Sequence, residues 1–282
     1  MLLALPIYGQ NRETDYLSHV LEKMNAVESV TYHCVKKAWE PGDKEPVYSV
    51  PTEIYEHVNP QDTAVGYSFL CASDKEFRQP LWVYDGTVFA YIEKEEKEVR
   101  IDDFTQKSPL PFRVIMPQAF GCMKSILEYV LNTQDSIVLS LKDEGKDYLM
   151  ELSIHTPYQV EFFGKACYMP QNPYIYDPTS IYKIWISKEN DMPYRYRREM
   201  QHSISEGICS DFVYNPYGKG KIVAEDYYPA DYVRRIKGEK SQKATVDMTG
   251  KKAPDWTLTD MNGQQVSLSG IKSKVILLQF TG

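Results

Sequence analysis

The chain has 282 residues, of which 43% are hydrophobic, and a formal net charge of -7 from 32 basic and 39 acidic residues. A chain of this length can bury a sizeable core, either in one large β domain or in two domains of medium size. Its acidic balance, without a basic cluster beyond short runs, argues against a nucleic-acid surface, so the expected partners exclude nucleic acid. We also expect no transmembrane span, because a helix that crosses a bilayer needs about 20 consecutive apolar residues.

The first ten residues are apolar and have two readings. Residues 1–10 match the end of a signal-peptide h-region, with Gly9 as a small residue before a cleavage site, although a basic n-region is missing. We interpret them as the remnant of a signal peptide, which places the protein in the periplasm or cell envelope. The alternative is an ordinary apolar N-terminal strand.

Apolar residues at helical spacing predict two helices. The first set predicts a helix over residues 14–26, with Thr14 or Asn11 as its N-cap: Leu17, Val20, Leu21 and Met24. The second set lies about a hundred residues later: Met123, Ile126, Leu127, Val130 and Leu131. Both stripes are typical of helices that cover a sheet on one side.

Alternating apolar residues predict about ten strands around these helices. The clearest pair is a hairpin over residues 81–92, because Asp85-Gly86 suits a tight turn. The other expected strands cover residues 30–39, 52–58, 65–71, 99–104, 137–141, 148–154, 160–163, 181–186, 194–200 and 207–214. The fold class is therefore α+β, with a curved antiparallel sheet or half-barrel and two helices over residues 11–233.

No residue in this domain qualifies as a catalytic, cofactor-binding or metal-binding site. The five cysteines are scattered and form no Cys-x-x-Cys, so we interpret them as small buried hydrophobes: Cys34, Cys71, Cys122, Cys167 and Cys209. The alternative for a secreted protein is one or two disulfide bridges, whose partners the sequence does not name, and the odd count leaves at least one cysteine unpaired within the chain. The five histidines show no ligand-type spacing: His19, His33, His57, His155 and His202. Residues 217–220 form a turn rather than a phosphate loop, since no strand-loop-helix context surrounds them.

We interpret two further segments, residues 195–198 and residues 168–176, as structural parts of the fold rather than as binding sites. Strand alternation places Arg195 and Arg197 on one face of the sheet and Arg198 on the other, so they form no single anion site. Residues 168–176 read as an aromatic and proline-rich connection that covers the sheet, or alternatively as the rim of a cleft.

The last 33 residues carry the most specific pattern. Ala253-Pro254-Asp255-Trp256 is followed by Asn262-Gly263, which favours a hairpin turn, and then by an apolar run over residues 275–280 that fits a buried strand. This stretch resembles the start of the TlpA and ResA-like thiol-disulfide oxidoreductases and of the related AhpC/TSA peroxiredoxins. The resemblance implies a thioredoxin-like domain over residues 250–282 that ends before its Cys-x-x-Cys, after a polar linker over residues 234–249. It implies a protein thiol or disulfide partner for the parent protein, and a chain that is itself inactive in thiol exchange.

The middle region is similar in plan to LolA-like periplasmic domains. The similarity lies in the helix that precedes residue 30, the Tyr84-Asp85-Gly86 hairpin, and residues 182–197. It implies a curved sheet around helices, with an apolar concavity able to hold acyl chains or a partner segment. Two functions follow: a partner-binding or scaffold domain of an exported thioredoxin-like oxidoreductase, or a periplasmic carrier for a lipid or hydrophobic peptide. A purely structural envelope domain is the third alternative.

Overall fold

The computed structural model describes residues 8–105, 113, 115, 118–171, 177–218, 220–238, 249–273 and 275–276. The chain divides into two compact units, Met1–Glu239 and Lys240–Gly282. None of the described helices is both long and apolar enough to cross a membrane.

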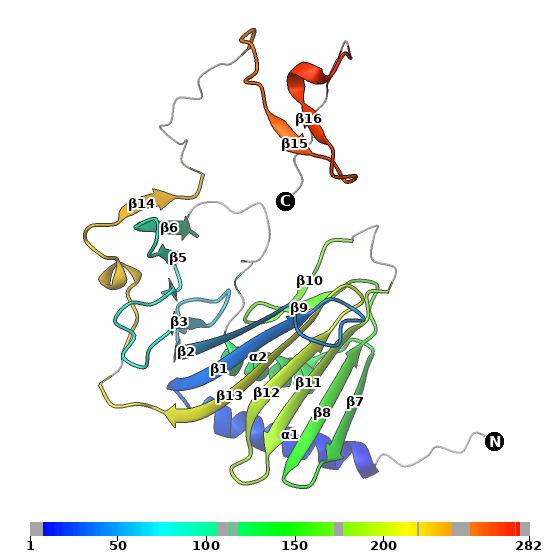
Figure 1. Cartoon of the computed structure of the whole chain (residues 1–282). Coiled ribbons are helices and arrows are strands. Elements are labelled where there is room, and N and C mark those ends of the chain that lie inside the picture. Colours follow the sequence, from blue (N-terminus) through cyan, green and yellow to red (C-terminus); the bar gives the residue numbers. More distant parts are fainter. Residues whose placement is uncertain are drawn as a thin grey trace, which may run out of the picture. The chain divides into compact units, whose positions relative to one another are not determined.

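The first unit is built on an open, curved sheet of twelve strands in the order β14-β6-β5-β4-β3-β2-β1-β13-β12-β11-β8-β7 (Figure 1). The strands are β1 (Ser29–Trp39), β2 (Tyr48–Val58), β3 (Tyr67–Ala72), β4 (Trp82–Tyr84), β5 (Val88–Glu93), β6 (Glu98–Asp103), β7 (Ile137–Asp143), β8 (Asp147–Ile154), β11 (Ser180–Ser187), β12 (Met192–Glu199), β13 (Ile204–Tyr214) and β14 (Val233–Ile236). The predicted α+β class with a large curved sheet and two helices is confirmed for this unit.

The edge strand β14 departs from the prediction in two ways. It pairs parallel to β6, whereas every other pairing among the described strands of this sheet is antiparallel. Residues 234–236 therefore belong to the sheet and not to the predicted linker. The sequence hid this strand because its partner is more than a hundred residues away and its arginines give it little apolar pattern.

Helices α1 (Tyr8–Asn25) and α2 (Ala119–Asn132) cover one face of the sheet, which we call the helix face (Figure 1). Leu17, Val20 and Met24 of α1 are buried, as the apolar spacing predicted. The predicted start at residue 14 is wrong, because α1 already includes residues 8–10 and places Asn11 and Thr14 inside the helix rather than at its N-cap. The N-terminal strand is thereby excluded for residues 8–10, and residues 1–7 lie outside the described part of the chain.

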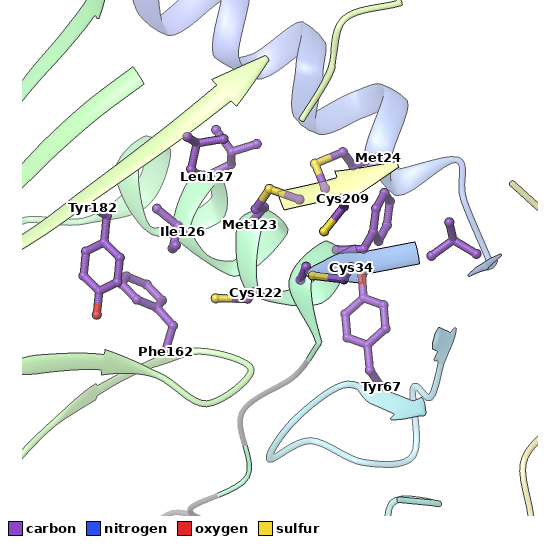
Figure 2. Close-up of a cluster of buried hydrophobic side chains, with 14 of the residues drawn as sticks. Met24, Cys34, Tyr67, Cys122, Met123, Ile126, Leu127, Phe162, Tyr182 and Cys209 are labelled. Carbon is purple, nitrogen blue, oxygen red and sulfur yellow. The ribbon is translucent and has the colours of Figure 1, made fainter. Parts of the chain in front are cut away.

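Helix α2 is the centre of the main core. Met123, Ile126 and Leu127 are fully buried and point toward the sheet, where Phe162 and Tyr182 meet edge to face at 5.0 Å (Figure 2). Phe162 comes from a small hairpin of β9 (Val160–Phe162) and β10 (Ala166–Tyr168), of which β10 was not predicted. The second helical stripe of the sequence is thus confirmed as a buried face.

The opposite face of strands β2 to β6 is covered by a second core. It contains Tyr55, Leu70 and Val83 from the strands, together with Ile222 and Ala224 from the segment that follows β13. This segment includes the 3-10 helix η1 (Ala224–Tyr227). Because both faces are covered, all six residues of β3 are buried, although their alternation had predicted a strand with one apolar face.

The second unit contains the predicted hairpin. Strand β15 (Thr257–Thr259) pairs antiparallel with β16 (Gln265–Ser267), and Gly263 in the connecting turn has φ +80°. A short 3-10 helix η2 (Leu268–Gly270) follows. The predicted strand over residues 275–280 is not formed at Val275 and Ile276, and residues 277–280 lie outside the described part.

Candidate functional site

A cavity of about 440 Å³ lies between strands β3 to β6 and the start of α2, and we call it the aromatic cavity. Its lining is dominated by rings and framed by two lysines: Lys36, Phe69, Trp82, Phe89, Asp102, Phe104, Ile115, Gln118 and Lys237. The strand register explains the cluster. Tyr84 of β4 pairs with Phe69 on the neighbouring strand β3 and with Phe89 on the other neighbour, β5. Residues that are paired across strands point to the same face, so both phenylalanines lie on the helix face. The rings of Phe69 and Phe89 are 6.4 Å apart.

Four of the nine lining residues are polar or charged: Lys36, Asp102, Gln118 and Lys237. The Lys36 ammonium donates to the Gln118 side-chain oxygen at 2.5 Å and lies 5.7 Å from the centre of the Trp82 ring. Lys237 pairs with Asp102 at 2.5 Å. Apolar rings beside polar and charged groups are typical of a site that orients an amphipathic ligand.

A second cavity of about 340 Å³ adjoins the first, since both are lined by Phe89, Asp102 and Lys237. Beyond these shared residues it continues over Tyr91 and the β6–β14 edge. The Tyr91 ring stacks on that of Trp82 at 6.2 Å. The ring surface of the first cavity therefore extends along the same face of the sheet.

A buried carboxylate lies behind the aromatic cavity, at the start of α2. Glu56 of β2 is fully buried and accepts hydrogen bonds from the backbone N–H of Phe120 at 3.0 Å, from that of Gly121 at 3.1 Å, and from the Tyr32 hydroxyl. These donors and the positive end of the helix dipole stabilise a carboxylate there. Burial opposes them more strongly and raises the pKa of Glu56 to about 7.

Gly121 is what allows Glu56 to approach the helix this closely. A Cβ at this position would lie 2.9 Å from a Glu56 carboxylate oxygen and 2.9 Å from the Tyr67 ring. The carboxylate therefore fixes the end of α2 that supplies Gln118 to the aromatic cavity.

A second ion pair, between Asp62 and Arg113, supports the β-hairpin side of the site. Asp62 is 6% exposed, accepts from the Tyr84 hydroxyl at 2.6 Å, and pairs with Arg113 at 3.3 Å. Arg113 also donates to the Tyr84 hydroxyl at 2.8 Å and lies over the Phe104 ring. This network holds Phe104 at the wall of the cavity.

The charged side chains in the lining of the two cavities are carboxylates and basic groups: Lys36, Glu98, Arg100, Asp102, Arg235 and Lys237. Among the described residues that line the two cavities there is no Ser, Cys or His. Nor do the described residues contain a group of three or more potential metal ligands from His, Cys, Asp and Glu.

The structure places the residues singled out in the sequence as follows. All five cysteines are free and buried, which confirms their reading as core residues. Arg195 and Arg197 share Glu206, whereas Arg198 pairs with Glu161, so the prediction of two separate faces is confirmed.

The remaining candidates form no common site. His33 pairs with Glu53 at 2.9 Å, and His19 lies 3.5 Å from Asp191 on another part of the surface. Gly218 has φ +78°, as suits the predicted turn, and Lys219 lies outside the described residues. Tyr168 belongs to β10, and its hydroxyl donates to Asp135, while residues 172–176 lie outside the described part.

Sequence reasoning did not single out Lys36 or Glu56, and a signal for both was available. In β1 and β2, alternation aligns Lys36 with Tyr32 and Cys34, and Glu56 with Ile54, on the apolar face. A charged residue at such an inward position is costly unless it has partners, so it marks a polar site inside the fold. The aromatic wall could not be read in the same way, because it combines rings from β3, β4 and β5 with Phe104, which follows β6.

Comparison with known proteins gives low similarity throughout. No family model matches the chain, and no curated protein matches it. Among solved structures, the Mycobacterium tuberculosis lipoprotein LppX has a TM-score of 0.37 at 8% identity, over 74% of this chain and 97% of that one. LprF from Mycobacterium bovis has a TM-score of 0.36 at 11% identity, over 74% and 98%.

A LolA superfamily protein from Nitrosomonas europaea also matches, with a TM-score of 0.26 at 10% identity, over 77% of this chain and 99% of that one. The LolA-like plan expected from the sequence is thus represented among the matching structures. At these scores the similarity assigns no function, and the function proposed below comes from this chain's own residues. The thioredoxin-like resemblance of residues 251–282 stays a prediction.

Proposed function

We propose that this chain is the binding module of an exported protein and that its aromatic cavity holds the apolar part of a lipid or a hydrophobic peptide. The observation that carries the proposal is the cavity of about 440 Å³ with four aromatic rings, Lys36 and Lys237 in its wall. Cavities of roughly 300–1,000 Å³ with apolar walls and few polar groups are the usual form of small-ligand sites. The carrier reading thus replaces the scaffold reading as the main hypothesis for residues 11–233.

The thioredoxin-like parent remains part of the proposal for the whole protein. Hairpin β15–β16 with Gly263 in its turn has the form that the resemblance of residues 251–282 implies. We propose that the binding module precedes a thiol-disulfide oxidoreductase or peroxiredoxin-like domain in the periplasm or cell envelope. This chain supplies no Cys-x-x-Cys for that chemistry.

Binding is tested with a homologous series of saturated fatty acids and with an apolar peptide, each competing against a dansyl-labelled fatty acid. Trp82 in the cavity wall serves as the energy donor to the dansyl group. Each added methylene that enters the cavity contributes about 0.8 kcal/mol, so the Kd falls about fourfold per carbon until the cavity is filled. If the peptide displaces the dansyl-labelled fatty acid and the unlabelled fatty acids do not, the ligand is a hydrophobic peptide rather than a lipid.

A matched pair of variants locates the site. Phe89→Glu places a carboxylate in the wall that the two cavities share. It should abolish the binding of the dansyl-labelled fatty acid, and with it the energy transfer from tryptophan to the dansyl group. Val138→Glu makes the same change on β7, where the side chain is 60% exposed and away from the cavity, and should bind as the original chain does. Absence of saturable binding by the original chain, or equal loss in both variants, would refute the proposal.

A further inference from the structure

Two of the five cysteines lie directly opposite each other in the middle of the sheet. Cys34 of β1 and Cys209 of β13 are register partners in an antiparallel pair. Both are buried, at 0% and 3% exposure. Figure 2 shows the two side chains on the core side of their strands, beside Met24 and Met123.

This placement meets the spacing that a disulfide requires. Opposed residues of antiparallel strands have Cα atoms about 4.5 or 5.5 Å apart. A disulfide joins residues whose Cα atoms are about 4.4–6.8 Å apart. The strand pair therefore brings the two cysteines into bonding range without a shift in register.

The remaining cysteines lack such a partner in the sheet. Cys71 lies on β3 opposite Ile54 and Trp82, Cys122 lies on α2, and Cys167 lies on β10 opposite Glu161. The register thus selects one pair among the five thiols.

We propose that Cys34 and Cys209 form a dithiol site that a small-molecule or protein disulfide oxidises to a bond between β1 and β13. The Cys34 thiolate attacks one sulfur of the oxidant, forms a mixed disulfide and releases the first thiolate. The Cys209 thiol then loses its proton and attacks the Cys34 sulfur, which releases the second thiolate. Two protein thiols are oxidised, one external disulfide is reduced to two thiols, and the protons pass to the released thiolates.

The surroundings assign the two roles. The adjacent Cys209 thiol lowers the pKa of the Cys34 thiol, whereas burial raises the pKa of Cys209 well above its ordinary value. The thiolate is the reactive form, so Cys34 is the first nucleophile and Cys209 resolves the intermediate. Because both sulfurs are buried, exchange with these roles requires a local opening that admits the oxidant while the two thiols stay side by side.

The Cys34–Cys209 disulfide would link the two neighbouring strands in the middle of the sheet. Strand β1 lies in the middle of the sheet. On one side of it come β2, β3, β4, β5, β6 and β14, and on the other side come β13, β12, β11, β8 and β7. A bond between residues 34 and 209 closes a loop that spans most of the first unit. Long closed loops restrict the unfolded chain most, so oxidation should raise the thermal midpoint by roughly 5–15 °C.

The test is to refold the full chain in reduced and in oxidised glutathione and to map its disulfides by mass spectrometry without reduction. We expect five free thiols in the reduced sample, three in the oxidised sample, and one linked peptide that joins Cys34 to Cys209. The experiment uses the unsubstituted chain, so its result does not depend on variants that could misfold. Five remaining thiols in the folded oxidised sample, or a bond to Cys122 instead, would overturn the proposal.

Matched variants add a second measurement. Cys34→Ser and Cys209→Ser should each keep four free thiols after oxidation and show no rise in thermal midpoint. Cys167→Ser, which removes a cysteine outside the pair, should fall from four thiols to two and keep the full rise. Loss of the rise in Cys167→Ser alone would contradict the assignment.

Discussion

The carboxyl group of Glu56 makes stability depend on pH in a direction opposite to that of most carboxylates. Its pKa is raised from 4.5 to about 7 because the side chain is fully buried at the start of α2. The folded state therefore holds this proton more tightly than the unfolded state does. The stabilisation is fully present below pH 4.5 and is lost as the pH rises through 7.

The size of the effect follows from the two pKa values. Each pH unit between them is worth about 1.4 kcal/mol, so Glu56 lowers the free energy of unfolding by about 2–3 kcal/mol between pH 5 and pH 8. Urea unfolding at pH 5, 6, 7 and 8, followed by far-ultraviolet circular dichroism, measures this decline. We expect the urea midpoint to fall across the series.

Glu56→Gln isolates the contribution of this one group. The amide cannot ionise, and its NH₂ replaces the oxygen that accepts from the Gly121 N–H at 3.1 Å. The variant should be about 1–3 kcal/mol less stable than the original chain at pH 5 because one buried donor loses its acceptor. The difference should shrink toward pH 8, where the original chain buries a charge and the variant does not.

Glu53→Gln serves as the control, since it removes a carboxylate of the same strand that is only partly buried and pairs with His33 at 2.9 Å. It should retain the decline that Glu56 causes. Parallel stability curves for the original chain and Glu56→Gln from pH 5 to pH 8 would refute the reasoning, because the decline would then come from other groups.

Three further changes test the packing around the site. Gly121→Ala should cost about 1–3 kcal/mol because its Cβ would press on Glu56 and the Tyr67 ring at 2.9 Å, whereas Gly220→Ala, which meets nothing within 4 Å, should be nearly neutral in the same urea assay. Leu127→Ala removes a fully buried side chain of α2 and should cost about 2–5 kcal/mol by calorimetry; a loss below 1 kcal/mol would mean that this helix face is loosely packed. Asp62→Ala leaves the Arg113 charge without its carboxylate and should cost about 3–5 kcal/mol, with a neutral result excluding the network as a support of the cavity.

The sequence was informative where neighbouring residues determine the structure. The stripe from Met123 to Leu131 predicted α2, and Asp85-Gly86 predicted the β4–β5 hairpin, because both depend on local spacing and turn geometry. The start of α1 was missed because Asn11 and Thr14 are good caps that here lie within a longer helix. Capping preference is a weak signal when tertiary packing extends a helix.

The site was less predictable because it joins residues that are distant along the chain. The wall of the aromatic cavity combines Lys36 of β1 with Phe89 of β5 and Lys237 after β14. No local pattern relates these residues, and only the pairing of the seven strands from β1 to β14 brings them together. The inward charges of Lys36 and Glu56 were the features that alternation alone could have revealed.

The central position of β1 has a consequence for the order in which the chain can fold. One edge of β1 pairs with β2, which follows directly in the chain, whereas the other edge pairs with β13 at residues 204–214. During synthesis that second edge stays without its partner until about 170 more residues have been made. An exposed strand edge is a template for pairing with another chain, so the growing protein is most prone to association in this interval. Binding of a chaperone to residues 29–39 would protect the nascent chain until the last antiparallel strand arrives.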